Sequence, residues 1–320
     1  MAHHETGTLK ARGRKLLKKL IYQRHLQIMI LLVMAYLFIF CYLPIFGLQI
    51  AFKDFMFNKG IWGSPFTGLK HFRAFFTDPN IWPALKNTLG ISLIKVFLMF
   101  PLPIFLALLL NEVSNKMFKK VVQTISYFPY FISWSIISVL ATNWLSTNTG
   151  FVNALLLSIG ILDKPIFFLG EPRLFWWISY TLDVWKTIGW ASIIYLAAIV
   201  SIDSEIFEAA YIDGASRMQM IVHITLPSIM STIMILFILN VGSMLGGGLY
   251  GSNFQISYLL GNLLNSPASE ILDTYILKIG ITLGRYSYAA AVGLLTSIVS
   301  FILLISTNFA SKKLTGESFM

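Results

Sequence analysis

The sequence predicts an all-α, polytopic membrane protein with about six transmembrane helices. Of its 320 residues, 56% are hydrophobic and only 12% are charged, whereas a soluble domain carries about 25% charged residues. Six segments are apolar over the roughly 20 residues that a helix needs to cross a bilayer. Lysine and arginine gather at the ends of these segments and in the loops, where membrane topology places them. The net charge of +10 therefore does not indicate a nucleic-acid-binding protein.

Residues 1–25 form a polar and basic segment that we expect on the cytoplasmic side of the membrane. The apolar run that follows is too long for the hydrophobic region of a signal peptide, and no small-residue cleavage site comes after it. We therefore expect this run to be retained as the first transmembrane helix. The basic residues before it are Lys10, Arg12, Arg14, Lys15, Lys18, Lys19 and Arg24.

The six expected spans cover residues 26–51, 88–110, 122–144, 174–200, 229–249 and 288–310. Together they define a transmembrane domain of residues 26–310, followed by a tail of residues 311–320. Prolines are expected to kink the second and third spans, and the one in the third span is Pro129. Between the third and fourth spans, residues 151–162 have the periodicity of a short helix on the membrane surface.

The distribution of basic residues predicts the orientation of the chain. An even number of spans places both termini on the same side of the membrane. Lysine and arginine are denser in the segments that this topology places inside than in the long loops that it places outside, which agrees with the positive-inside rule. We therefore expect both termini and the loop at residues 201–228 to be cytoplasmic.

The loop between the fourth and fifth spans has the pattern of two short helices joined by a turn. Residues 205–212 are good helix formers with acids in the first turn, where the helix dipole favours them, and Ser204 is the expected N-cap. Gly214 suits a turn residue with positive φ. A second short helix is expected from Ser216, and Pro227 permits a new start into the fifth span.

At this loop the sequence resembles a known family. It reads Glu208-Ala209-Ala210, then Asp213-Gly214-Ala215, with Leu226-Pro227 downstream. This pattern is similar to the EAA signature of type I permeases of binding-protein-dependent ABC importers. Other stretches resemble the carbohydrate-uptake branch, and within it the oligosaccharide permeases of the lipoprotein/alginate-uptake kind. They are Ile50-Ala51-Phe52-Lys53-Asp54, Gly68-Leu69-Lys70-His71-Phe72, Asn87-Thr88-Leu89-Gly90 and Leu108-Leu109-Leu110-Asn111-Glu112.

The resemblance implies a type I ABC importer permease (MetI-like) fold and a transport subunit without an ATPase site of its own. In that family the EAA loop forms the coupling helix, which seats in a cleft of the ATP-binding subunit. The residues that take this role by resemblance are Glu208, Ala209, Ala210, Asp213, Gly214, Ala215, Arg217, Leu226 and Pro227. The alternative is a loop that only caps the fifth span.

The resemblance also implies the partners. They are a second homologous permease chain in a heterodimer, two copies of a P-loop ATPase that hold ATP and magnesium, and an external solute-binding protein that delivers a carbohydrate. The cargo would be an oligosaccharide, and the positive charge of the chain would suit an acidic, alginate-like one. The expected location is the plasma (inner) membrane of a bacterium, in contact with lipid. We expect no cofactor to be bound by this chain itself.

Three polar residues inside the spans are candidates for the translocation path, because ionisable groups within a membrane are costly and mark functional sites. Asp183 and Lys186 lie three residues apart in the fourth span, on one helix face, where they could pair. A structural pair, or a lysine reaching the outer interface, is the alternative, and Lys95 has the same ambiguity. Asn240 in the fifth span could line the path or bind a neighbouring helix.

The sequence lacks the motifs of several other functions. No Gly-x-x-x-x-Gly-Lys-Ser/Thr loop is present to hold ATP phosphates. We expect no metal site and no catalytic residue, because neither Cys/His metal spacing nor paired carboxylates for glycosidase chemistry occur. Three alternatives stay open: the same machinery with another solute such as peptides, amino acids or phosphate; an ion- or proton-coupled carrier, for which Asp183 is the clear candidate acid; and a membrane-embedded enzyme.

Overall fold

The computed structural model describes residues 22–246 and 253–315, and every regular element in these ranges is helical. The β pairing within them is one isolated antiparallel bridge, between Lys53 and Phe66. The chain divides into two compact units, Met1–Gly68 and Leu69–Met320. The prediction of an all-α protein is confirmed. The basic segment expected at residues 1–25 lies almost entirely outside the described residues.

In the first unit, one long apolar helix covers Arg24–Phe52. It comprises α2 (Arg24–Leu37), a π-helical turn η1 (Phe38–Tyr42) and a 3-10 segment η2 (Leu43–Phe52). No side chain of α2 is buried, and a helix that is apolar on all sides suits lipid rather than water. This helix corresponds to the first expected span. After it comes the short α3 (Gly60–Gly63), where Lys53 Nζ donates to the Ile61 carbonyl at 2.8 Å.

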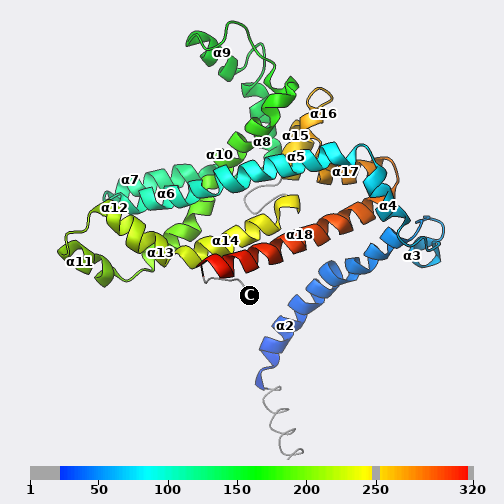
Figure 1. Cartoon of the computed structure of the whole chain (residues 1–320), viewed down its shortest axis with the longest axis horizontal. Helices are drawn as coiled ribbons and strands as arrows, with labels where there is room; N and C mark the ends of the chain where they lie inside the picture. Colours follow the sequence, from blue (N-terminus) through cyan, green and yellow to red (C-terminus); the bar gives the residue numbers. More distant parts are fainter. Residues whose placement is uncertain (1–21, 247–252, 316–320) are drawn as a thin grey trace, which may run out of the picture. The chain divides into compact units, whose positions relative to one another are not determined.

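Three helices of the second unit are also long and apolar enough to cross a membrane (Figure 1). They are Ile81–Glu112, α10 (Pro172–Val200) and α18 (Tyr286–Thr315). The first of them comprises α5 (Ile81–Ile94), a π-helical turn η3 (Lys95–Met99) and α6 (Pro101–Glu112). These helices correspond to the second, fourth and sixth expected spans.

The third expected span is broken by 100° rather than merely kinked. It consists of α7 (Lys116–Tyr127), η4 (Phe128–Phe131) and α8 (Trp134–Trp144). Pro129 lies in η4 and cannot donate a helical hydrogen bond, and Ser133 then starts α8 as an N-cap, its Oγ accepting from the Ile136 N–H. The expected single helix over residues 122–144 is therefore two helices.

The fifth expected span also follows a break. A segment of α12 (Arg217–Met220), η6 (Ile221–Thr225) and α13 (Leu226–Ser228) meets α14 (Met230–Gly242) at 60°. A short 3-10 turn, η7 (Met244–Gly246), comes after α14; the end of this expected span, residues 247–249, lies outside the described residues. Within those residues the chain has four spanning helices, or six if each bent pair is one span, in agreement with the predicted number.

Short helices lie between the spans. The helix expected at residues 151–162 is α9 (Phe151–Ser158). The others are α4 (Lys70–Thr77), α11 (Ser204–Ile212), η5 (Phe168–Gly170), α15 (Asn253–Leu260), α16 (Ser266–Ser269), α17 (Leu272–Leu277) and η8 (Lys278–Thr282). The last four follow α14 in the chain and connect it to α18.

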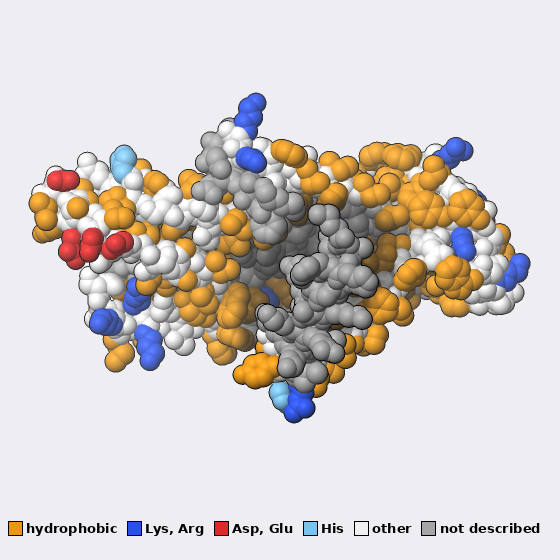
Figure 2. All heavy atoms as spheres, turned by 90° about the horizontal axis from the view of Figure 1, so that it is seen from below, with side chains coloured by type: hydrophobic (Ala, Val, Ile, Leu, Met, Phe, Trp, Pro, Cys, Tyr) orange, Lys and Arg blue, Asp and Glu red, His pale blue; other side chains and the backbone are white. Residues whose placement is uncertain are grey.

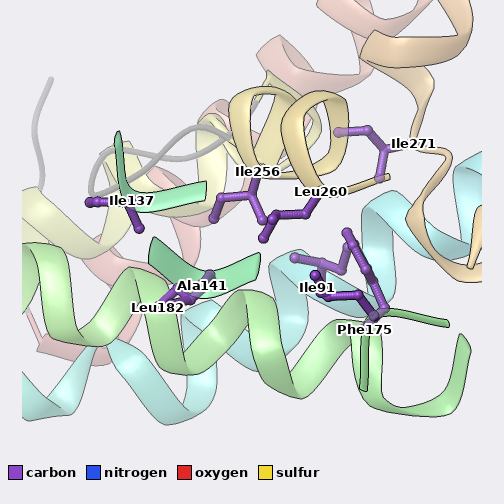
Figure 3. Close-up of a cluster of buried hydrophobic side chains, with 9 residues drawn as sticks. Ile91, Ile137, Ala141, Phe175, Leu182, Ile256, Leu260 and Ile271 are labelled. Atoms are coloured by element: carbon purple, nitrogen blue, oxygen red, sulfur yellow. The ribbon is translucent and has the colours of Figure 1, made fainter. Parts of the chain in front are cut away.

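In the second unit, α10 packs against α5, α6, α7 and α16, while α14 packs against α18. Hydrophobic side chains also cover much of the surface (Figure 2), as lipid contact requires. In the interior, side chains of α5, α8, α10 and α15 form one apolar cluster (Figure 3). Ile91, Ile137, Phe175 and Ile256 are each 1% exposed there. This core fixes the positions of the four helices around the polar groups described next.

Candidate functional site

The helix α11 carries the first half of the EAA-like pattern. Its N-cap is Asp203, whose Oδ1 accepts a hydrogen bond from the Glu205 N–H at 3.0 Å. Ser204, the cap expected from the sequence, is instead the first helical residue. A carboxylate is at least as good a cap as a hydroxyl, and its charge also interacts favourably with the helix dipole. No side chain of α11 is buried.

Gly214 forms an elbow after α11 with a φ of 79°, so the predicted positive φ is confirmed. The Ala215 N–H donates to the Ala210 carbonyl at 2.9 Å, and the Gly214 N–H donates to the Tyr211 carbonyl at 3.1 Å. This pair of bonds defines a Schellman motif. No atom lies within 4 Å of the position that a Cβ on Gly214 would take. Glycine is therefore required by the backbone angle and not by lack of space.

After the elbow, the chain restarts as α12 through a capping box between Ser216 and Gln219. The Ser216 N–H donates to Gln219 Oε1 at 2.8 Å, and the Gln219 N–H donates to Ser216 Oγ at 3.4 Å. The helix then widens into the π-helical η6. Leu226 and Pro227 follow in α13, at the 60° bend into α14. They thus join the elbow to a membrane helix.

The surface of this segment is acidic and exposes both small and large apolar side chains. The exposed acids are Asp203, Glu205, Glu208 and Asp213. Acidic side chains gather in the region of α11 in Figure 2. Ala209 is exposed and Ala210 is half-buried, and the larger Tyr211 and Ile212 beside them are 77% and 83% exposed. Arg217 lies 4.0 Å from Glu112 of α6, an exposed pair that contributes little energy.

Asp183 of α10 is fully buried and forms an ion pair with Lys95 of η3. Lys95 Nζ also donates to Asn253 Oδ1 at 2.5 Å. Asn253 Nδ2 in turn donates to Ser92 Oγ at 3.1 Å, and Ser92 Oγ donates to the Met244 carbonyl at 2.6 Å. One polar network therefore joins α5, η3, η7, α10 and α15. Its members are distant in sequence, so no local pattern could have indicated it.

Lys186 does not form the ion pair with Asp183 that the sequence suggested. Its Nζ donates to the carbonyls of Tyr130 at 2.7 Å and Ile132 at 2.5 Å, with Pro129 at 3.4 Å. These carbonyls lie at the 100° break between η4 and α8, where helical bonding stops. Lys186 thus satisfies the Tyr130 and Ile132 carbonyls at the break, whereas the Pro129 carbonyl also accepts from the Ile132 N–H at 3.1 Å.

Asn240 is 5% exposed and lies on α14. Two residues further, a Cβ on Gly242 would come within 2.9 Å of Leu304 on α18, so α14 and α18 pack closely there. The predicted coupling residues form one continuous segment from α11 to α13, whereas the predicted path residues lie on α10 and α14. The roles of both groups stay predictions.

Sequence reasoning missed a polar cluster around Asp78, which follows α4. The hydroxyls of Tyr275 and Tyr288 donate to its Oδ2 at 2.5 Å and 2.7 Å, and the Arg285 guanidinium lies 4.4 Å from the centre of the Tyr288 ring. Burial acts to raise the pKa of Asp78, but the two hydroxyls, the Asn80 N–H and the Arg285 charge outweigh it and hold this pKa below its usual value. Burial and the bond to Asp78 raise the pKa of Tyr275.

These arrangements are suited to binding and to holding helices together. Among the described residues, no group of three or more His, Cys, Asp or Glu side chains could hold a metal ion. The family model described as "Binding-protein-dependent transport system inner membrane component" matches residues 99–316, which include α10, the EAA-like segment and α14. The chain belongs to this family. This permease is the membrane component of an ABC importer and acts as a transport subunit.

Individual relatives cover nearly the whole permease. It is 42% identical to the polygalacturonan/rhamnogalacturonan transport system permease protein YteP of Bacillus subtilis (strain 168), over 96% of this chain and 94% of that protein. It is 40% identical to protein LplB of the same organism, over 89% of this chain and 87% of that protein.

Two solved structures also match the permease over nearly its whole length. A chain of a bacterial ABC transporter involved in the import of the acidic polysaccharide alginate matches with a TM-score of 0.84 and 36% identity, covering 94% of this chain and 99% of that one. A chain of the bacterial alginate ABC transporter in complex with an alginate pentasaccharide-bound periplasmic protein matches with the same TM-score and identity, covering 94% and 98%. The predicted type I ABC importer permease fold is thereby confirmed.

Proposed function

We propose that this permease forms half of the translocation pathway for an oligosaccharide in the plasma membrane of a bacterium, with both termini in the cytoplasm. A second, homologous permease chain supplies the other half. Two copies of a P-loop ATPase, which bind ATP and magnesium, drive the cycle. An external solute-binding protein delivers the cargo. Family membership supports this assembly, as does the likeness to a transporter that was solved with its periplasmic protein.

The cargo that we propose is an acidic oligosaccharide. Support comes from two of the matches described above, because polygalacturonan and alginate are both polymers of uronic acids. The chain itself has a net charge of +10, although the orientation signals at the helix ends account for much of it. The same machinery with a non-sugar cargo is the second candidate, because the coupling segment does not specify which solute is carried.

The observation that carries the coupling role is the exposed acidic helix α11, joined through the Gly214 elbow and α13 to the membrane helix α14. We propose that this segment, residues 204–228, seats on the ATPase subunit. Glu208 would meet a basic side chain there, and Ala209 and Ala210 would allow close approach. When the ATPases close on ATP, the segment would move, and α14 would move with it. The energy for this change comes from contacts that differ between the two states.

An ion-coupled carrier is less well supported. Asp183, the acid on which that alternative depended, is ion-paired with Lys95 and fully buried. A buried acid held by a lysine is poorly placed to exchange protons during transport. A carrier would also extract from the membrane alone, whereas this permease should co-purify with a P-loop ATPase and a second permease chain.

Uptake by the reconstituted complex tests the cargo. Proteoliposomes containing both permeases and the ATPase, supplied with the binding protein, should import tetramers of galacturonate or mannuronate when ATP is enclosed on the ATPase side. Maltotetraose is the neutral comparison. Import of none of these saccharides, together with ATP-dependent import of an amino acid, peptide or phosphate, would show that the cargo is not a carbohydrate.

Charge reversal tests the coupling surface. Glu208→Lys should weaken attachment of the ATPase, measured as the amount of ATPase that co-purifies with the permease. The matched control is Asp163→Lys, which reverses an exposed charge after α9, away from α11. Equal recovery of the ATPase with both variants would contradict the assignment of α11.

A further inference from the structure

A cleft of about 690 Å³ lies between α15, α16, α17 and η8, and none of the residues of the Asp183 and Asp78 clusters line it. This volume is within the range of small-molecule sites. Several polar side chains line the cleft, although its exposed surface is mainly apolar, as in most small-molecule sites. Three lining residues carry the argument that follows: Tyr258, Glu270 and Lys278.

The walls of the cleft are held rigidly. On α15, Ile256 and Leu260 face the apolar core (Figure 3), so the helix cannot rotate freely. Asn265 Nδ2 donates to the carbonyls of Leu169 at 2.8 Å and Leu260 at 3.0 Å, and Asn262 Nδ2 donates to the same Leu169 carbonyl at 2.8 Å. The loop between α15 and α16 is thus tied to η5, and the cleft is formed before any ligand arrives.

Several polar groups of the cleft serve the fold, but others are available to a ligand. Thr274 Oγ1, for example, both donates to and accepts from the backbone of Ile271. The Ser257 hydroxyl is different: the residue is 4% exposed, and its Oγ has no hydrogen-bond partner among the described residues. This hydroxyl has almost no accessible surface, so it lies within the wall of the cleft rather than open to a ligand.

Glu270 and Lys278 form a charged pair that faces the same cleft. Lys278 Nζ donates to Glu270 Oε1 at 2.8 Å. The lysine side chain is 59% exposed and has three N–H donors, so at least one further acceptor can bind it. The second carboxylate oxygen of Glu270 can accept. Side by side, such a donor and acceptor match the adjacent hydroxyls of a sugar ring.

Tyr258 supplies an apolar platform beside these polar groups. Its ring stacks on that of Phe254, one turn earlier on α15, with centroids 5.4 Å apart and 14° between the planes. The side chain is nevertheless 59% exposed, so one ring face is open. A sugar ring presents C–H groups on its faces and hydroxyls on its edges. An open aromatic face next to a charged donor and acceptor therefore fits this chemistry.

Two other cavities of the second unit fit a sugar less well. The cavity between α8, α9 and α10, about 480 Å³, is lined by Trp144, Trp177 and Trp185 and other mainly apolar side chains. The cavity beside Asp78, about 390 Å³, is lined by the same Glu270 and Lys278, but its tyrosine, Tyr275, is buried and bound to Asp78, so it offers no open ring face. Only the cleft at α15–α17, among these three, combines an open aromatic face with unused polar groups.

We propose that this cleft binds one sugar ring of the saccharide that the permease carries, with the ring stacked on Tyr258 and two adjacent hydroxyls bound by Lys278 and Glu270. The proposal rests on the proposed carbohydrate transport. By the expected topology the cleft faces outside, where a binding protein releases its cargo. It would be an entry subsite, separate from Asp183, Lys186 and Asn240 in the membrane interior.

The test uses the reconstituted complex of both permeases, ATPase and binding protein. The probes are tetragalacturonate, tetramannuronate and maltotetraose, and the readout is the saccharide concentration at half-maximal uptake. Tyr258→Ala should raise this concentration roughly tenfold for the imported probe, because it removes the stacking face. Tyr258→Phe, which keeps the ring, should change it little. Lys278→Gln should also raise it roughly tenfold or more, because it removes a charged donor.

Matched controls separate the cleft from general effects. Lys86→Gln removes an exposed lysine outside the cleft and should leave the half-maximal concentration unchanged. ATP hydrolysis without saccharide should be unchanged in every variant, which shows that each one is folded and assembled. If the wild-type complex imports a probe, and Tyr258→Ala and Lys278→Gln leave the half-maximal concentration for that probe unaltered, the cleft is not a sugar site. Carbohydrate transport itself would still stand. Wild-type failure to import any of the three probes, together with ATP-dependent import of an amino acid, peptide or phosphate, would overturn both.

Discussion

Lys95 and Asp183 bury two charges in the membrane-spanning part of the chain. Taking either charge alone out of water costs several kcal/mol, and their attraction repays this only when the geometry is good and further hydrogen bonds are present. Here Lys95 has both the carboxylate and the Asn253 amide. The pair is therefore sound evidence of a fixed helix arrangement, and weaker evidence of a net gain in stability.

This reasoning predicts an asymmetry between single and double substitutions. Asp183→Asn should lower the free energy of unfolding by about 3–5 kcal/mol, because it leaves the Lys95 charge buried without its partner. Combining Lys95→Met with Asp183→Leu should recover most of that loss. Unfolding of the detergent-solubilised permease measures both the loss in the single variant and its recovery in the double variant. Glu112→Gln, at the exposed pair with Arg217, is the control and should cost less than about 1 kcal/mol.

Gly214 carries a second prediction at this scale. At a φ of 79°, Gly214→Val should cost about 1–2 kcal/mol locally and shift the elbow. Insertion into the membrane should be retained and uptake lost. Gly160→Val is the matched control, because Gly160 has a φ of 72° and equally open surroundings but lies after α9. If Gly214→Val imported normally, the elbow would have no part in coupling.

The Asp78 cluster acts between elements, since it ties the end of α4 to α17 and α18. Because the pKa of Asp78 is held below its usual value, the folded chain binds its proton less tightly than the unfolded chain does. The stabilisation is therefore complete near neutral pH and is lost as the pH falls through the lowered pKa. The raised pKa of Tyr275 acts on the alkaline side: its contribution is complete below about 10, the ordinary pKa of a tyrosine, and is lost as the pH rises from there through the raised pKa.

Asp78→Asn measures this contribution directly. The wild-type permease should unfold less readily than the variant at pH 7, and the difference should shrink as the pH drops below about 4, the ordinary range of a carboxyl group. Thermal unfolding at a series of pH values shows the trend. A difference between the two proteins that stayed constant down to pH 2 would mean that the carboxylate charge contributes nothing there.

The sequence predicted the helices much better than their breaks. Hydropathy depends on about 20 neighbouring residues, so it located all the membrane segments. The sharp break after Pro129 depends also on Lys186, a side chain of another helix that binds the freed carbonyls. Local pattern favoured Ser204 as a cap, although the competing Asp203 stood one position earlier. Such choices are settled by tertiary contacts or by small differences in capping energy.

For the whole molecule, the two kinds of candidate site differ in how far the sequence could reveal them. The coupling segment is contiguous, so a pattern of residue types at fixed spacing identified Glu208, Gly214 and Pro227 together. The polar network around Asp183 and the cleft at Tyr258 are assembled from distant segments. Their residue types are ordinary, and only the fold brings them together. A sequence can therefore indicate the candidate coupling segment of such a transporter more readily than its candidate binding surfaces.

The bend at Pro227 provides a test of the proposed coupling. Pro227 has no N–H, and it lies where α12–α13 meets α14 at 60°. Pro227→Ala restores the donor and removes the ring clash, so a straighter helix becomes favourable. If movement of α11 reaches α14 through this bend, the variant should still bind ATPase and hydrolyse ATP, but should import several-fold less saccharide per ATP. Pro172→Ala is the control, because at the first turn of α10 the extra N–H needs no helical partner. An unchanged ratio of uptake to hydrolysis in Pro227→Ala would show that force passes into the membrane by another route.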